Sequence, residues 1–393
     1  MAVLPAQMKS FVPLKRPPPV SSAHEGKQAR LRTSRSAAAL ADTRIGAGVV
    51  ILNTGPSGQL VLEGHRASSY LESIAIGKPA METYRASLSE FIAWCRRLNL
   101  DWSSLAGLDH LLVTFMDELF FRGKASSEGS KLLAAVKHFI PTVSRFGTES
   151  LPRSARATKS WIKAAPGMQR LPLPLVLLCA MMGHMLFFRR FWTAVKVFVQ
   201  FRTYMRPGIC DSLKVFQLVP PSAAAGGHYA RWGFLLNPVE LGVPGKTGLW
   251  DQAVVWDTEL WMSAIFEQLH HQPQRASLWP VNALETIDHF NEAVEALGLT
   301  NLHPTRYSLR HGGASDDILS KRRSIEAVKI RGHWKADTSL RRYGKETRVL
   351  AELRKAAPQV IEYGAEVLND LEQLLVSRKP PRAPPVVGRL AGG

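Results

Sequence analysis

The stretch from residue 307 to residue 345 constrains the fold of this chain more than any other, because its residues predict a helix that packs very closely against a neighbouring segment. Tyr307 and Arg310 are three residues apart, so they share one face if a helix starts just before them. Gly312 and Gly313 follow, and a glycine pair is costly inside a helix unless another backbone, of the protein or of a partner, must come close. The pattern therefore predicts a tightly packed helix that presents an arginine.

The second half of the same stretch places a tyrosine among cations. A Gly-His-Trp turn comes first, at residues 332 to 334, and Tyr343 follows it. Arginine has a planar fork that binds two phosphate oxygens at once, so this combination favours a phosphate ligand. The candidate phosphate contacts around the tyrosine are Arg341, Arg342 and Lys345.

Two further cations lie at turns upstream. Arg206 precedes Pro207, and a residue before proline avoids the helical region, so its side chain either points into a cleft or faces the dipole at a helix end. Lys246 lies in a tight turn bounded by Gly245 and Gly248, where a lysine either projects toward a ligand in a groove or is simply solvated. Neither position decides by itself between its two interpretations.

These positions resemble the signatures of the tyrosine recombinases, the phage-integrase family. Arg310 matches the arginine of the His-x-x-Arg signature, Gly332-His333 matches the Gly-His pair, and Tyr343 matches the nucleophile. Arg206 completes the first signature, a helix that ends in Thr-Gly-(Leu/Met)-Arg, and Lys246 matches the lysine of the hairpin between the two arginines. The resemblance is strong between Arg206 and Tyr343 and loose elsewhere.

Three departures from the family pattern are visible. Tyr307 stands where the family has a histidine, and Tyr204 replaces a glycine in the first signature. The interval from His333 to Tyr343 is one residue longer than usual. Either His333 or Trp334 therefore occupies the position that the family fills with histidine or tryptophan.

The resemblance implies that DNA strands are cleaved and rejoined through a 3′-phosphotyrosyl intermediate, which requires neither water nor a metal. In that scheme Arg206 and Arg310 bind the non-bridging phosphate oxygens, and His333 adds a hydrogen bond there. Lys246, whose ordinary pKa is about 10.4, protonates the departing 5′ oxygen. Tyr307 keeps a hydrogen bond but is a poor base near neutral pH.

Charge favours a polyanionic partner. The net charge is +18 and the isoelectric point about 10.1, and the excess extends beyond the basic ends into the folded part, which favours nucleic acid. The resemblance implies double-stranded DNA as the partner and a homo-oligomer, a tetramer, on it. We expect no metal and no small-molecule cofactor, because the sequence has no His-Glu-x-x-His motif, P-loop or carboxylate cluster.

The cysteines and the apolar runs indicate in which cellular compartment the protein is expected. Cys95, Cys179 and Cys210 are widely spaced in apolar surroundings, which predicts three buried thiols in a reducing interior. No signal peptide is visible. The apolar run from residue 171 to 188 is interrupted by proline and glycine, which favours a core helix over a membrane span. We therefore expect an intracellular, DNA-associated protein, nuclear if the source is eukaryotic.

The organisation along the chain predicts two domains with basic extensions. We expect a disordered basic arm over residues 1–66, a helical core-binding (SAM-like) DNA-binding domain over 67–167, a recombinase-like catalytic domain over 168–376, and a disordered basic tail over 377–393. The fold class is mainly α with a small antiparallel β-sheet (an α+β catalytic domain), preceded by an α-helical bundle domain.

Local periodicity supports this fold class. An amphipathic helix is predicted over Met81–Arg97, and one long helix is predicted from about Leu175 to Tyr204. Short β-like runs separated by Gly/Pro turns predict the sheet, and they cover 213–219, 229–236 and 252–256. An amphipathic segment after Tyr343 either packs on its own core or docks on a neighbouring protomer.

Two functions remain open at this point. The first is an active recombinase or integrase of the kind that mobile elements use. The second is a catalytically weakened or inactive DNA-binding protein derived from a recombinase. The presence of both arginines, the lysine and Tyr343 favours the first, while Tyr204 and Tyr307 favour the second.

Overall fold

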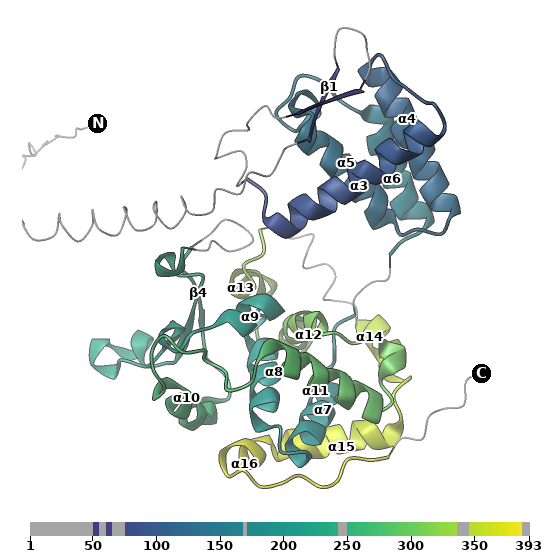
Figure 1. Cartoon of the computed structure of the whole chain (residues 1–393). Helices are drawn as coiled ribbons and strands as arrows, with labels where there is room; N and C mark the ends of the chain where they lie inside the picture. Colours follow the sequence, from purple (N-terminus) through teal and green to yellow (C-terminus); the bar gives the residue numbers. More distant parts are fainter. Residues whose placement is uncertain are drawn as a thin grey trace, which may run out of the picture. The chain divides into compact units, whose positions relative to one another are not determined.

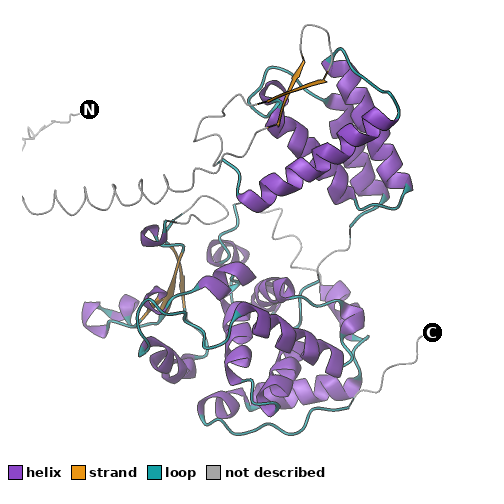
Figure 2. Cartoon of the chain, in the orientation of Figure 1, coloured by secondary structure: helices purple, strands orange, loops and turns teal. Residues whose placement is uncertain are grey.

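The computed structural model describes residues 50–54, 60–64, 75–167, 171–242, 250–335 and 346–386. The chain divides into two compact units, residues 1–167 and 168–393 (Figure 1). Most of the described secondary structure is helical, with a few short strands (Figure 2). The predicted fold class, mainly α with a small antiparallel sheet, is confirmed.

The N-terminal unit is a helical bundle in which α3 packs against α5 and α4 packs against α6. Its described helices are α3 (Lys78–Arg97), α4 (Leu105–Phe121), α5 (Ser126–Phe139) and α6 (Pro152–Ala164), with the 3-10 turn η1 (Pro141–Val143). Ahead of the bundle, β1 (Val50–Thr54) pairs antiparallel with β2 (Leu60–Gly64). Both strands lie within the basic arm that the sequence predicted over residues 1–66.

Aromatic rings fill the core of this bundle. On α3 the predicted apolar stripe is buried at Leu88, Phe91 and Ile92, and Trp94 joins it. The Phe115 ring lies 5.6 Å from that of Phe91 and 5.2 Å from that of Trp94. Tilted ring contacts of this kind stabilise a core beyond the area that they bury.

A buried carboxylate joins two helices of the bundle. Asp109 of α4 accepts hydrogen bonds from the backbone N–H groups of Arg153 and Ser154, at 2.9 and 2.8 Å. These N–H groups belong to the first turn of α6, where no intrahelical acceptor exists. Asp109 therefore caps a helix that begins more than forty residues later in the chain.

In the C-terminal unit, further helices pack around the buried helices α7 and α8. Its described helices are α7 (Leu175–Phe187), α8 (Phe191–Thr203), α9 (Pro207–Ser212), α10 (Ser263–His270), α11 (Ala283–Ala296), α12 (Arg306–Leu319), α13 (Ile325–Arg331), α14 (Glu346–Leu353), α15 (Pro358–Asn369) and α16 (Leu371–Val376). Its short 3-10 turns are η2 (Val215–Gln217), η3 (Ala223–Ala225), η4 (Gly227–Tyr229), η5 (Val239–Leu241), η6 (Leu260–Met262) and η7 (Thr300–Leu302).

The sheet has the strand order β3-β4-β5, with β3 (Leu218–Val219), β4 (Gly233–Leu236) and β5 (Gln252–Val255) all antiparallel to their neighbours. Each strand falls inside one of the predicted β-like runs and is shorter than that run. Phe234 and Val254 are paired and buried, and the Phe234 ring meets Phe266 of α10 edge to face at 5.6 Å. One face of the sheet therefore joins the core.

The prediction of one long helix from about Leu175 to Tyr204 is wrong in one respect, because the structure has two helices there, α7 and α8. The chain reverses between α7 and α8, where Arg189 takes a left-handed backbone with φ 59°. The Arg190 N–H then donates to the Met185 carbonyl at 2.7 Å, which closes the turn. The two helices pack on each other, so the apolar run that suggested one long helix is buried in both.

The amphipathic C-terminal segment packs on its own core. Helix α15 lies against α7, and a Cβ added at Gly183 of α7 would lie 2.7 Å from the Val367 side chain. A Cβ added at Gly364 of α15 would lie 2.1 Å from the Val176 carbonyl oxygen. Two glycines thus permit the direct contact.

The apolar run of α7 is core rather than membrane, since its residues from Leu177 to Leu186 are buried in the unit. Across the described ranges, no helix has both the length and the apolar character that a membrane crossing requires. The three cysteines are buried and unpaired, as the sequence predicted. Burial raises the pKa of the Cys95 thiol to about 11 and that of the Cys179 thiol to about 12, so both are protonated near neutral pH.

Candidate functional site

Helix α12 approaches neighbouring backbone at its two glycines. A Cβ added at Gly313 would lie 1.9 Å from the carbonyl oxygen of Phe201, and one at Gly312 would lie 2.2 Å from that of Leu173. Of the two alternatives that the glycine pair left open, the structure shows contact with the protein's own backbone. This approach brings the end of α8 beside the middle of α12, where Arg310 lies.

Arg310 is buried, with 4% of its surface exposed, and two backbone carbonyls hold its guanidinium. Its Nη2 donates to the Gly332 carbonyl oxygen at 2.6 Å, and its Nη1 donates to the Tyr204 carbonyl oxygen. Its Cζ lies 4.5 Å from the centre of the Trp334 ring, a cation–π distance. These contacts hold the guanidinium in one orientation.

The Gly-His-Trp turn follows α13 and requires its glycine. A Cβ added at Gly332 would lie 1.9 Å from the Trp334 ring. That ring also stacks on Tyr204, with centroids 6.1 Å apart and planes at 26°. His333, between them, has a left-handed backbone with φ 52°. The turn therefore directs the indole toward α8 and α12, and the imidazole takes no part in these indole contacts.

His333 is influenced by the charges of the two arginines that the sequence singled out. Burial lowers the pKa of its imidazole below the ordinary value of 6.5, and the charges of Arg310 and Arg206 lower it further. Its Nε2 is buried and makes no hydrogen bond with any part of the chain that the structure describes. A neutral imidazole with an unsatisfied ring nitrogen, beside two guanidinium groups, suits a negatively charged ligand.

Arg206 has the extended backbone that the following proline predicts, with φ −65° and ψ 143°. It is the N-cap residue of α9, three positions beyond the last residue of α8, so it does not face the C-terminal dipole of a helix. Its side chain is partly exposed and forms no hydrogen bond or ion pair with the described residues. Only its charge acting on His333 links it to the site here.

Tyr307 lies in the first turn of α12, on the same helix as Arg310, as predicted. Thr305 is the N-cap residue, and its N–H donates to the Ser308 hydroxyl at 3.2 Å. The Tyr307 ring lies 5.5 Å from the ring of His311, one turn further along the partly exposed face. Sequence reasoning missed His311, although its i, i+4 spacing from Tyr307 was visible.

The carboxylate after the first signature supports a different arginine. Asp211 pairs with Arg306 at 2.8 Å and with the buried Lys196 at 2.7 Å, not with Arg206. Burial opposes ionisation of Asp211, but hydrogen bonds from Arg306 and Lys196 outweigh it and hold its pKa below the ordinary range. These two ion pairs connect Arg306 at the start of α12 with Lys196 of α8, through Asp211 of α9.

A larger ionic cluster includes Arg331, the residue directly before the Gly-His-Trp turn. The Arg323 guanidinium contacts Asp257 at 2.5 Å and Asp317 at 2.7 Å, and Arg331 contacts Asp257 at 3.3 Å. The buried Arg202 pairs with Asp316 at 2.7 Å in the same way. These pairs join α8, α12, α13 and the end of β5, and sequence reasoning identified none of them.

Lys246 and Tyr343 lie outside the described residues, and so do the predicted DNA contacts Arg341, Arg342 and Lys345. The structure therefore brings together Arg310, Trp334 and His333, with Arg206 close enough to act on the imidazole, and puts Tyr307 on the same helix as Arg310. No metal-binding group of His, Cys, Asp or Glu occurs within the described ranges.

No family model matches the chain, and no curated protein sequence matches it. Among solved structures, it is similar to a lambda integrase(75-356) dimer bound to a COC′ core site. The identity is 17%, the match covers 70% of this chain and 94% of that one, and the TM-score is 0.45.

Proposed function

We propose that this protein is a tyrosine-type DNA strand-exchange enzyme, similar to a site-specific recombinase or integrase. It would act on double-stranded DNA as a homotetramer inside the cell, and in the nucleus if its source is eukaryotic. The observation that carries the proposal is the surroundings of His333. Its buried, unpartnered Nε2 lies within reach of the charges of Arg206 and Arg310, and this combination fits one phosphate group.

The proposed chemistry assigns each residue one task. The Tyr343 hydroxyl attacks phosphorus, its phenolic proton passes to solvent water, and the bond from phosphorus to the 5′ oxygen breaks. Lys246 donates a proton to that 5′ oxygen. Arg206, Arg310 and His333 stabilise the negative charge on the other phosphate oxygens.

His333, rather than Trp334, is the residue that we assign to the phosphate. The Trp334 indole is used against Arg310 and Tyr204, whereas the His333 Nε2 has no described partner. A neutral imidazole can donate one hydrogen bond to a phosphate oxygen without needing a proton from solution. Trp334 would then act as a support for the arginine.

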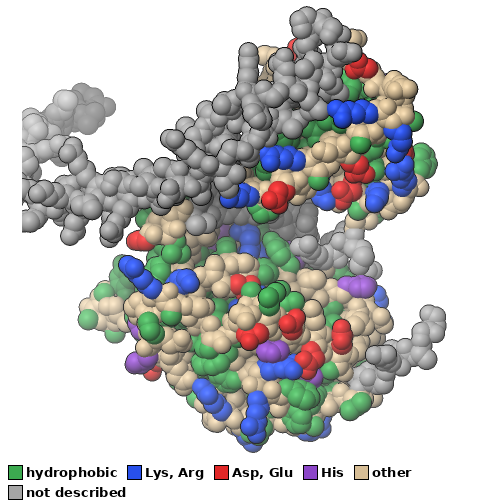
Figure 3. All heavy atoms as spheres, viewed as in Figure 1, with side chains coloured by type: hydrophobic (Ala, Val, Ile, Leu, Met, Phe, Trp, Pro, Cys, Tyr) green, Lys and Arg blue, Asp and Glu red, His purple; other side chains and the backbone are tan. Residues whose placement is uncertain are grey.

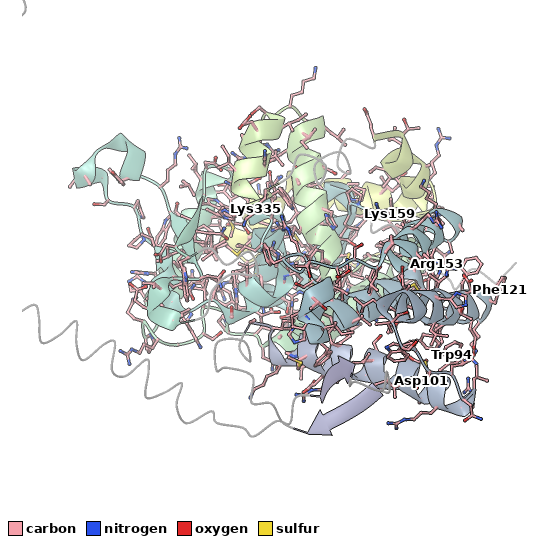
Figure 4. All side chains as sticks on the ribbon, turned by 90° about the horizontal axis from the view of Figure 1, so that it is seen from above. Trp94, Asp101, Phe121, Arg153, Lys159 and Lys335 are labelled. Carbon is pink, nitrogen blue, oxygen red and sulfur yellow. The ribbon has the colours of Figure 1, made fainter. Side chains whose placement is uncertain are left out.

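The N-terminal unit offers a second surface for DNA. Helix α6 carries Arg153, Arg156, Lys159 and Lys163 at steps of three or four, all exposed, and it contains no carboxylate. Such spacing gathers the four cations on one face. Figure 3 shows Lys and Arg side chains over the visible face of this unit, and Figure 4 labels Arg153 and Lys159. We propose that this face contacts DNA phosphates.

The test is a duplex that carries a nick next to the cleavage point, so that a cleaved strand cannot be rejoined. The full chain should form a covalent protein–DNA adduct, resistant to denaturant, that is lost in Tyr343→Phe and kept in Tyr229→Phe. Tyr229 is a suitable control because it is 63% exposed and lies outside the signature stretch of residues 307 to 345. An adduct that survives Tyr343→Phe would refute the assignment of the nucleophile.

A DNA-binding protein without strand-cleaving activity is the second candidate. Two observations favour it: Arg310 is only 4% exposed with two donors engaged by carbonyls, and Tyr307 stands at the usual histidine position. It predicts salt-dependent DNA binding with no adduct on the nicked duplex. The adduct experiment therefore separates the two candidates directly.

A further inference from the structure

Tyr204 has a backbone conformation that disfavours its side chain. Its φ of 52° and ψ of 28° put it in the left-handed region, where glycine is the unstrained residue. Yet its side chain is completely buried, with 0% of its surface exposed. A buried tyrosine held in such a conformation must be fixed by contacts around it.

Three groups of Tyr204 make contacts at the same time. Its carbonyl oxygen accepts a hydrogen bond from Arg310 Nη1. Its ring stacks on Trp334, and the Arg331 guanidinium lies 5.6 Å from the centre of the ring. Its hydroxyl donates to Asp317, which is also held by Arg323 at 2.7 Å. One residue thus connects the arginine of α12, the Gly-His-Trp turn and the ionic cluster.

A glycine at this position would keep the carbonyl and remove the strain. The contribution that belongs to the tyrosine itself therefore lies in its ring and hydroxyl. The ring supports the Trp334 indole, and the indole lies against the Arg310 guanidinium at 4.5 Å. Removing the phenol would take away the ring that stacks on the indole, and so loosen the indole that lies against the guanidinium.

We infer that Tyr204 is a positioning residue that holds Arg310 in place through Trp334. It touches no DNA in this scheme, and its side chain acts on the arginine only through the indole. The catalytic meaning of this inference rests on the proposed function, but the positioning itself can be measured without DNA.

The experiment is modification of arginines in the full chain by phenylglyoxal, read by peptide mass spectrometry. Arg306 is the internal control, because it is 7% exposed on the same helix and is held by Asp211 and Gln200 rather than by Tyr204. In Tyr204→Gly, modification of Arg310 should rise about tenfold while that of Arg306 stays unchanged. In Tyr204→Phe, which keeps the ring, protection of Arg310 should be largely restored.

The inference is overturned if Arg310 stays protected in Tyr204→Gly, or if Arg306 becomes reactive to the same degree. Tyr204→Asn is the second variant, since asparagine also tolerates the left-handed region, and it decides the matter if the glycine variant does not fold.

The nicked duplex adds a separate arm. Tyr204→Gly should slow adduct formation about 100-fold with DNA affinity unchanged, as expected for a misplaced arginine. If the wild-type chain forms no adduct, the proposed function fails, while the modification data still decide the role of Tyr204.

Discussion

The Arg310 Nη2 donates to the carbonyl oxygen of Gly332 at 2.6 Å, which joins the two halves of the signature stretch through a backbone atom. Backbone carbonyls of the surrounding fold therefore help to place the arginine. The glycine is needed because the Trp334 ring covers its Cα, as the 1.9 Å clearance for an added Cβ shows. Both features depend on how closely α8, α12 and α13 approach one another.

The glycine of closest approach should be intolerant of a side chain. Gly313→Ala places a methyl group 1.9 Å from the Phe201 carbonyl oxygen, so the helices must separate. We expect the stability of the C-terminal unit to fall by about 3 kcal/mol, the upper part of the range for overpacking. Gly208→Ala is the matched control, because nothing lies within 4 Å of its added Cβ. Equal urea midpoints for the two variants would contradict this account.

Phosphate binding should be coupled to protonation of His333 only below neutral pH, because the imidazole is neutral near pH 7. Its pKa lies below 6.5 in the free protein because of burial and of the two arginines, and an added anion would raise it. The complex therefore binds a proton more tightly than the free protein does, so DNA affinity should increase as the pH falls from neutrality through the range below 6.5. Fluorescence anisotropy with a labelled duplex measures this trend, which His333→Gln should flatten. An unchanged trend in that variant would assign the proton elsewhere.

The ionic cluster should make the C-terminal unit sensitive to acid. Burial opposes ionisation of Asp257, but hydrogen bonds from Arg323 and the charges of Arg331 and Arg323 hold its pKa below 3.8. Its contribution to stability is therefore complete above pH 3.8 and is lost as the pH falls through the lower, folded-state value.

Asp257→Asn should lower stability at pH 7 by about 3 kcal/mol, because it leaves arginines without their partner. The variant should also lose less stability than the wild type on acidification. Asp288→Asn, at an exposed carboxylate of α11, should change neither quantity. Urea titrations at pH 7 and pH 3 measure both quantities. If the wild type and Asp257→Asn lose the same amount of stability between these pH values, the assignment to Asp257 is wrong.

The basic face of α6 should appear in the salt dependence of DNA binding. Replacing Arg156 and Lys159 together by glutamine removes two exposed cations from one face. We expect the slope of log affinity against log salt to fall by about 2, because each of these cations would neutralise about one phosphate. Lys131→Gln on α5 is the control, since that lysine already pairs with Glu128 at 2.8 Å. A slope that the double variant leaves intact would exclude this face from the interface.

The tyrosine at the usual histidine position should limit the rate. Tyr307 is a poor proton acceptor near neutral pH, whereas an imidazole at the same place on α12 has an ordinary pKa of about 6.5. Tyr307→His should therefore form the adduct faster than the wild type on the nicked duplex, with unchanged DNA affinity. His311→Gln, one turn further on, tests whether the neighbouring imidazole already serves that purpose. No gain in Tyr307→His would mean that Tyr307 has a structural role.

Local features of the site could be predicted from the sequence, and pairings between distant residues could not. The glycine pair predicted a close backbone contact, and Pro207 predicted the extended conformation of Arg206, because each depends on steric limits of one or two residues. The pairing of Arg323 with Asp257 spans 66 positions, and no spacing rule predicts such a contact.

The break between α7 and α8 escaped prediction for a related reason. Both helices are buried on almost every side, so the apolar run shows no change of period where the chain turns at Arg189. Tyr204 gives the opposite case. The sequence marked it as a departure from a glycine, but only the structure reveals that the tyrosine keeps the left-handed backbone that a glycine would favour.

The packing of α15 against α7 restricts how copies of this chain can assemble. With Gly183 and Gly364 in direct contact with the opposite helix, the C-terminal segment completes the interior of its own protomer. If α15 packed on a neighbouring protomer instead, the core of its own protomer would be exposed until the neighbour's α15 replaced it. Any oligomer built in this way would be a domain swap, which would form and dissociate slowly and persist on dilution.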